Sequence, residues 1–146
     1  AYSHDGLFSI GTEHFQSFAL GRYADYAGGV ALPHRVSVVT SLDGTSWNQL
    51  YNSNEAIPAA AWHHVVIIFH DGFFSTYLDS SLDVTSDIGG TFLLGDNHAF
   101  LGRSYDEINR DYDIDGRLDE VRIYNRALSE TEIQALYCSP PELISV

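Results

Sequence analysis

The sequence predicts an all-β protein, an antiparallel β-sandwich of the jelly-roll type with one short C-terminal helix. Short runs rich in β-branched and aromatic residues recur at intervals of roughly ten residues, as they do in sandwiches and barrels. Two of the breaks between these runs are Asp-Gly pairs, which favour the tight turns of antiparallel hairpins. The 146 residues contain no internal repeat and no linker, so we expect a single domain over residues 1–146.

The first half of the chain begins with two short candidate strands, Leu7–Ile10 and Phe15–Leu20. A clear hairpin follows, because Val36–Leu42 is rich in β-branched residues and Asp43-Gly44 separates it from a second run, Trp47–Tyr51. The polar, proline-containing stretch 52–61 is predicted to be a connection.

Trp62–His70 is the strongest predicted strand. Its apolar residues fall on both faces, which is typical of a strand in the middle of a covered sheet, and we expect Trp62 itself in the core. Asp71-Gly72 then predicts a hairpin into Phe73–Leu78. His63 and His64 are adjacent and must face opposite ways, so packed or hydrogen-bonded histidines are a better interpretation than zinc ligands.

The rest of the chain contains weaker strands. Leu82–Gly95 is predicted to be a polar link that includes one short strand at Thr91–Leu94. Ala99–Gly102 is another short strand, and Leu118–Tyr124 has the β-branched and aromatic residues of a closing strand.

The C-terminal helix is predicted from its capping residues. Ser129 and Glu132 spell the S-x-x-E capping box, in which each side chain satisfies a backbone N–H of the first turn. A helix of about two turns is not stable alone, so the apolar stripe through Ile133 and Tyr137 should pack on a sheet. Cys138 at its end is expected to be an unpaired, half-buried small hydrophobe.

Composition excludes several classes of function. Twenty acidic residues against seven basic ones give a formal net charge of −13, which repels nucleic acid and anionic membrane surfaces. No apolar run approaches the length of about 18 residues that a membrane span needs. The single cysteine allows neither an internal disulfide nor a cysteine zinc site. Calcium and uncharged polar ligands such as sugars remain compatible with this acidity.

Four motifs in the second half of the chain resemble the laminin-G-like, concanavalin A-like jelly-roll domains. They are Trp62-His63-His64-Val65, Tyr77-Leu78-Asp79, Leu101-Gly102-Arg103, and the run from Gly116 to Ser129 with Glu132-Ile133. The resemblance covers about Trp62 to Tyr137. It implies two packed antiparallel sheets in a secreted or cell-surface protein, most often a module that binds glycans or proteins.

The chain departs from that family in two places. Asp79-Ser80-Ser81 stands where the family has an Asp-Gly turn, which predicts a longer turn or one of another type. The family's opening strands are not found ahead of Leu7, so they have either diverged or are missing from this sequence. If they are missing, an unpaired sheet edge favours a homodimer.

A calcium site is predicted in the acidic stretch before the closing strand. Alternate carboxylates followed by glycine, D-x-D-x-D-G, are the first half of a calcium loop, but Arg122 stands where an EF-hand has its bidentate glutamate. The candidate ligands are Asp111, Asp113, Asp115 and Asp119. The alternative is a solvated acidic loop in which Asp119 hydrogen-bonds the backbone.

The favoured function is a non-catalytic, lectin-like carbohydrate-binding module. Aromatic faces stack on sugar rings, while carboxylates and arginine hydrogen-bond the hydroxyl groups. Candidate ligand-binding residues in or beside loops are Trp47, Tyr51, Arg103, Tyr105, Asp106, Asn109 and Tyr112. A protein-protein adhesion module is the second alternative. A small glycoside hydrolase is the third, although the E-x-D-x-x-E and E-x-D-x-E motifs of related glucanases do not occur, so we expect no catalytic residues.

Overall fold

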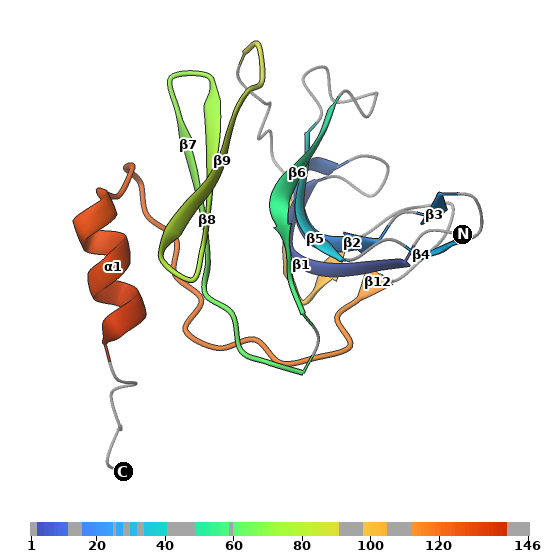
Figure 1. Ribbon diagram of the computed structural model, residues 1–146. Coiled ribbons are helices and arrows are strands. Elements are labelled where there is room, and N and C mark those ends of the chain that lie inside the picture. Colours follow the sequence, from blue (N-terminus) through green and yellow to red (C-terminus); the bar gives the residue numbers. More distant parts are fainter. Residues whose placement is uncertain are drawn as a thin grey trace.

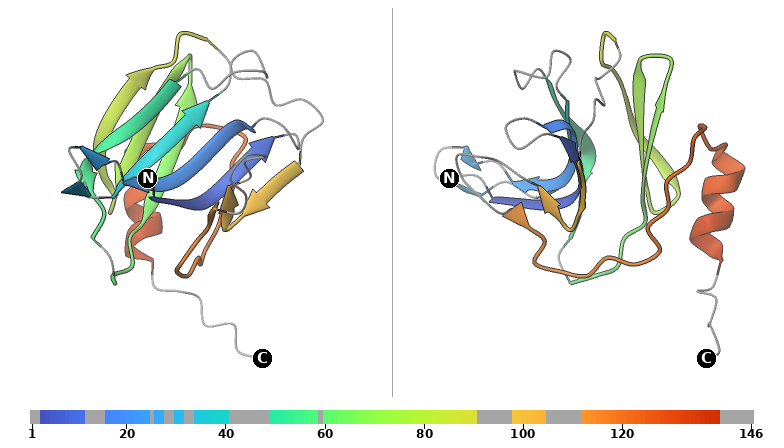
Figure 2. Two further views of the ribbon diagram at one scale, coloured as in Figure 1. Left: turned by 90° about the vertical axis from the view of Figure 1, so that its right-hand side faces the viewer. Right: turned by 180° about the vertical axis from the view of Figure 1, so that it is seen from behind.

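The computed structural model describes residues 3–11, 16–24, 26–27, 30–31, 34–40, 49–58, 60–90, 98–104 and 112–139. These residues form two antiparallel sheets that face each other, with the helix α1 on the outer side of the smaller sheet (Figure 1). The views in Figure 2 show the same layered arrangement from two other directions. The predicted all-β sandwich with one short helix is therefore confirmed.

The larger sheet has five strands in the order β10-β1-β2-β5-β6. Its strands are β1 (Ser3–Gly11), β2 (Gln16–Ala24), β5 (Arg35–Thr40), β6 (Gln49–Ala56) and β10 (His98–Leu101). Each was expected, but β6 continues to Ala56 through residues predicted to be a connection. The turn predicted at Asp43-Gly44 and the strand predicted at Thr91–Leu94 lie outside the described residues.

The smaller sheet has three strands in the order β7-β8-β9. They are β7 (Val65–His70), β8 (Phe73–Leu78) and β9 (Ser81–Asp87). The Asp71-Gly72 turn between β7 and β8 is confirmed, with φ of 50° and 83° at its two central residues. The central position predicted for β7 is wrong, since among the described residues it pairs with β8 alone.

The β8–β9 turn is shorter than predicted. Leu78 and Ser81 are paired, so only Asp79 and Ser80 lie between the strands. Both residues have positive φ, 48° at Asp79 and 70° at Ser80. This is the backbone of a two-residue hairpin turn, which usually contains glycine. It is the turn that an Asp-Gly pair would form, so both parts of the prediction, a longer turn or one of another type, are wrong.

Two small antiparallel pairs complete the strands. β3 (Tyr26–Ala27) pairs with β4 (Val30–Ala31), and β11 (Arg103–Ser104) pairs with β12 (Tyr112–Asp113). The β11–β12 pair brings the Leu-Gly-Arg motif beside the acidic stretch that was predicted to bind calcium.

The core lies between the two sheets. Val38 of β5, Phe74 of β8 and Ile88 are almost fully buried and pack together, with Ile67 and Phe69 of β7 against them. The Phe69 and Phe74 rings are 5.4 Å apart between centroids. Burying each of these side chains contributes about 1.5 to 3 kcal/mol, so this cluster is the main attraction between the sheets.

Asp83 connects the two sheets at one side of the sandwich. Its carboxylate oxygens accept hydrogen bonds from the backbone N–H groups of Asn54 at 2.6 Å and Glu55 at 2.8 Å. The Asn54 side chain also donates to the Asp83 carbonyl at 2.9 Å. One side chain of β9 thus satisfies backbone donors on the edge strand β6.

The predicted closing strand at Leu118–Tyr124 is wrong. Residues 117–128 contain no strand, and the apolar side chains between Leu118 and Tyr124 are exposed, with Val121 50% and Ile123 78% exposed. The residue types suit a strand, but a strand also needs a partner, and that depends on contacts distant in sequence. Trp62 and Cys138 are likewise exposed rather than buried.

Helix α1 spans Glu130–Cys138 and has the predicted capping box. The Ser129 hydroxyl accepts from the Glu132 N–H, and Glu132 accepts from the Ser129 N–H. Ile133 is fully buried, which fixes the helix to the outer face of the smaller sheet. No helix among the described residues is long and apolar enough to cross a membrane.

Candidate functional site

Most of the predicted ligand-binding residues cannot be placed. Trp47, Tyr105, Asp106 and Asn109 lie outside the described residues, as does the predicted metal ligand Asp111. Tyr51 lies on β6 and Tyr112 on β12, but their side chains are also outside the described part. The site predicted from loop aromatics therefore stays a prediction.

Arg103 is the one predicted ligand-binding side chain that is described, and it contacts a predicted metal ligand. Arg103 and Asp113 are direct cross-strand partners on β11 and β12. The Arg103 Nε donates to Asp113 Oδ1 at 2.8 Å. This hydrogen bond holds the pKa of the Asp113 carboxyl below its usual value, so the carboxylate is ionised but already has a cationic partner.

The other candidate calcium ligands are not brought together in the described part of the chain. Asp115 and Asp119 are both exposed, and no group of three acidic, histidine or cysteine side chains there could hold a metal ion. Asp119 accepts a hydrogen bond from the Glu120 backbone N–H at 2.8 Å. This is the local backbone contact that the alternative interpretation expected of Asp119.

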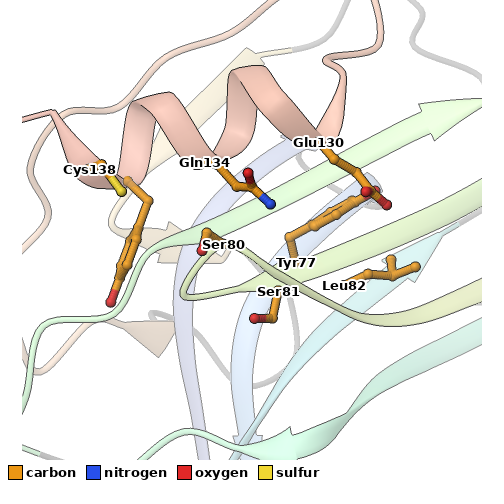
Figure 3. Close-up of a pocket in the computed structure, with 8 residues that line it drawn as sticks. Tyr77, Ser80, Ser81, Leu82, Glu130, Gln134 and Cys138 are labelled. Atoms are coloured by element: carbon orange, nitrogen blue, oxygen red, sulfur yellow. The ribbon is translucent and has the colours of Figure 1, made fainter.

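A pocket of about 500 Å³ lies between α1 and the β8–β9 hairpin. Glu130 and Gln134 project from the helix toward the β8–β9 hairpin, which contributes the side chains of Tyr77, Ser80, Ser81 and Leu82 (Figure 3). The lining residues are Tyr77, Ser80, Ser81, Leu82, Glu130, Gln134, Tyr137 and Cys138. The pocket thus combines two tyrosine rings with hydroxyl, amide and carboxylate groups, which are the side chains that bind polar small molecules.

Tyr77 is at the base of the pocket. It is only 8% exposed, and it lies on the face of β8 that α1 covers. Burial and the nearby Glu130 carboxylate raise the pKa of Tyr77 above its usual value. The phenol therefore keeps its proton at neutral pH and remains a hydrogen-bond donor.

The Asp79 turn positions the two serines of the pocket. Asp79 Oδ1 accepts from the His64 backbone N–H at 2.9 Å, and Asp79 Oδ2 lies 2.9 Å from His63 Nδ1. The Asp79 N–H also donates to the His64 carbonyl at 2.9 Å. These contacts hold Asp79 in its left-handed conformation, which aspartate tolerates better than most residues. They confirm that His63 is a hydrogen-bonded structural histidine.

The helix wall of the pocket is fixed at both ends. At the N-terminal end, Arg126 donates to both Glu132 oxygens, at 2.9 and 2.6 Å, and this pairing with the cap lowers the pKa of Glu132 to about 2. At the other end, the Tyr137 ring packs on His64 with centroids 5.8 Å apart. The same histidine segment therefore contacts the turn and the helix, the two walls of the pocket.

The chain belongs to the concanavalin A-like lectin/glucanase superfamily, because a laminin-G-like family model of that superfamily matches residues 7–134. The match also covers the first half of the chain, where sequence analysis found no motif of the family. Among solved structures, the chain is similar to residues 221–444 of an S-layer domain-containing protein from Clostridium thermocellum ATCC 27405, at 21% identity and a TM-score of 0.48. That likeness covers 82% of this chain and 56% of that chain. No curated protein matches.

Sequence analysis missed the pocket because its walls come from two distant segments. Tyr77 belongs to a recognised motif, but the motif was used only as a mark of the fold. Ser80 and Ser81 were treated as a turn, and Gln134 was given no role. The one useful indication was the helix stripe through Tyr137, which required a sheet beneath the helix and so placed these segments face to face.

Proposed function

We propose that the chain is a non-catalytic carbohydrate-binding module of a secreted or cell-surface protein. The observation that carries the proposal is the pocket between α1 and the β8–β9 turn, which is lined by the nearly buried Tyr77, the half-exposed Tyr137, and the hydrogen-bonding groups of Ser80 and Gln134. Aromatic and hydroxyl or amide groups together match the apolar and polar faces of a sugar ring. Membership of a superfamily of lectins and glucanases supports the same ligand class.

The same pocket argues against hydrolysis. A retaining glycosidase needs two carboxyl groups about 5 Å apart across the scissile bond, and an inverting enzyme needs two that are about 6.5 to 9.5 Å apart. Glu130 is the only carboxylate among the lining residues. A module that binds a sugar without cleaving it is therefore the better proposal.

A protein-protein adhesion module is the second candidate. The observation that favours it is the exposed apolar side chains of residues 117–128, among them Leu118, Val121, Ile123 and Tyr124. Clustered apolar surface of this kind is typical of contact sites. Its partner would be a protein with a matching apolar patch, and the sugar pocket would then play no part in binding.

A glycan array with labelled protein tests the proposal. We expect sugar-dependent binding that Gln134→Ala weakens about two- to tenfold, because one hydrogen bond to ligand contributes about 0.5 to 1.5 kcal/mol. Thr131→Ala on the same helix is the matched control, since Thr131 does not line the pocket. Trp47→Ala and Tyr105→Ala test the loop site in the same assay. If no glycan binds, and Ile123→Ser abolishes binding to a protein partner, the adhesion function replaces this proposal.

A further inference from the structure

Glu130 is the only acidic or basic side chain that lines the pocket between α1 and the β8–β9 turn. It stands in the first turn of α1 and is exposed, and its side chain reaches toward Tyr77 in Figure 3. The pocket is therefore negative as well as aromatic. An anionic sugar, such as a uronate or a sulfated glycan, would place like charges together there, whereas a cationic group would be attracted.

The arginines in the described part of the chain do not neutralise Glu130. Arg126 pairs with Glu132 at 2.6 Å, and Arg122 pairs with Glu120 at 2.5 Å. Arg103 pairs with Asp113 at 2.8 Å, between β11 and β12. The chain contains no lysine, since all seven basic residues are arginine. Arg35 donates to the Ser53 carbonyl on β6, and neither it nor the exposed Arg117 forms an ion pair with Glu130. Within the described residues, the Glu130 carboxylate therefore has no cationic partner.

The Tyr77 ring near Glu130 adds to the attraction for a cation, because a tyrosine ring attracts an ammonium group within about 6 Å of its face. Tyr137 lines the other end of the pocket, about two helical turns from Glu130. A carboxylate together with aromatic faces is a favourable surrounding for a protonated amine. The Ser80, Ser81 and Gln134 groups are left to bind the hydroxyl groups of the same ligand.

We infer that the pocket binds an amino sugar with a free, protonated amino group, whose ammonium lies at Glu130 near the Tyr77 ring. This inference rests on the proposed carbohydrate-binding function and names its ligand class. An N-acetylated sugar lacks the charge and is bulkier at the same position, and a simple hexose has a hydroxyl there. Both should bind more weakly than the free amine.

Three oligosaccharides that differ only at C2 test the inference. We would titrate the protein with β-1,4-linked tetramers of glucosamine, N-acetylglucosamine and glucose in a calorimeter, at pH 6 and moderate salt. The glucosamine tetramer should bind at least tenfold more tightly than the other two. Glu130→Gln should remove this difference while leaving the weaker affinities within about twofold.

A charge-matched control separates the pocket from general attraction to an acidic protein. Asp87→Asn removes one negative charge at the far end of β9, outside the pocket. It should change the affinity for the glucosamine tetramer less than twofold. An equal effect of the two variants would overturn the inference, since attraction would then come from the net charge alone.

The remaining outcomes distinguish this inference from the proposed function. If the three tetramers bind equally well, the amine preference is wrong but the carbohydrate-binding function stands. If lysine amide competes as well as monomeric glucosamine, the pocket recognises amines without the sugar, and the inference is wrong. If neither the tetramers nor any array glycan binds, the proposed function itself fails.

Discussion

The β8–β9 turn provides the sharpest test of the fold, through the substitution Ser80→Gly. Ser80 has a φ of 70°, in the left-handed region that disfavours residues with a Cβ atom. The Ser80 hydroxyl makes no hydrogen bond within the described residues. The substitution therefore removes backbone strain without removing a hydrogen bond. Glycine at this position also creates the Asp-Gly pair that two-residue turns prefer.

The expected gain follows from two opposing effects. The left-handed conformation costs an ordinary residue about 1 to 2 kcal/mol, which glycine avoids. Glycine loses more chain entropy on folding, which costs about 0.5 to 1 kcal/mol. The net change is a stabilisation of about 0.5 to 1 kcal/mol. For a chain of 146 residues this raises the melting temperature by about 1 to 4 °C.

Urea denaturation followed by far-UV circular dichroism would measure the free energy of unfolding. Ser81→Gly is the matched control, because it deletes the same hydroxyl group one residue later, where β9 begins and φ is not positive. It should destabilise the protein by about 0.5 to 1 kcal/mol. If both variants change stability in the same direction, the two-residue turn with left-handed Ser80 is wrong.

Further predictions concern a sheet contact, two titrating groups, the metal and the assembly. Asp83→Ala should cost about 1 to 2 kcal/mol in urea denaturation because two β6 donors lose their acceptor. Asp87→Ala should cost less, since in the described part of the chain its side chain accepts a single hydrogen bond, from Gly89. The pKa of His64 is lowered, chiefly by burial, so as the pH falls the unfolded state takes up the proton before the folded state does. The free energy of unfolding should therefore fall as the pH drops below about 6.5, and His64→Gln should reduce this dependence on pH. Burial alone would raise the pKa of Asp79, but the hydrogen bonds from His63 and His64 outweigh burial and lower it. The contribution of the Asp79 carboxylate to the free energy of unfolding should therefore be lost only below about pH 4. If calcium binds the predicted aspartates with a Kd near 10⁻³ M, 10 mM calcium should stabilise the protein by about 1.4 kcal/mol, and an unchanged melting temperature against chelator would contradict the site. Sedimentation equilibrium tests the predicted homodimer through a sheet edge, and a monomer at high concentration would contradict it.

The sequence predicted the layers of the fold better than the positions of strands within them. An apolar, β-branched run and the Asp71-Gly72 turn located β7 and β8, because both signals depend on residues close in sequence. β9 was missed because Ser81–Asp87 is rich in serine and aspartate, which are typical of loops, so most of this segment was predicted to be part of a polar link. The edge position of β7 could not be predicted, since it depends on which distant segments pair.

The candidate site shows the same limit. The capping box of α1 was readable from Ser129 and Glu132 because its atoms belong to one turn of helix. The pocket was not, because Tyr77 and Gln134 become neighbours only when α1 docks on the smaller sheet. Arg103 and Asp113 were assigned to different sites, although their cross-strand pairing makes them one ion pair.

The Asp79 turn links the stability of the fold to the shape of the pocket. The carboxylate of Asp79 holds the residues before β7, and its backbone conformation directs Ser80 and Ser81 toward α1. Asp79→Gly would keep the left-handed backbone but lose both acceptors, so it should destabilise the turn that Ser80→Gly stabilises. The tolerance of this turn for glycine therefore depends on which of its residues carries the hydrogen bonds. Since Ser80→Gly also removes a pocket hydroxyl, a variant that is more stable and binds sugar less tightly would show that the turn serves the fold and the ligand through different atoms.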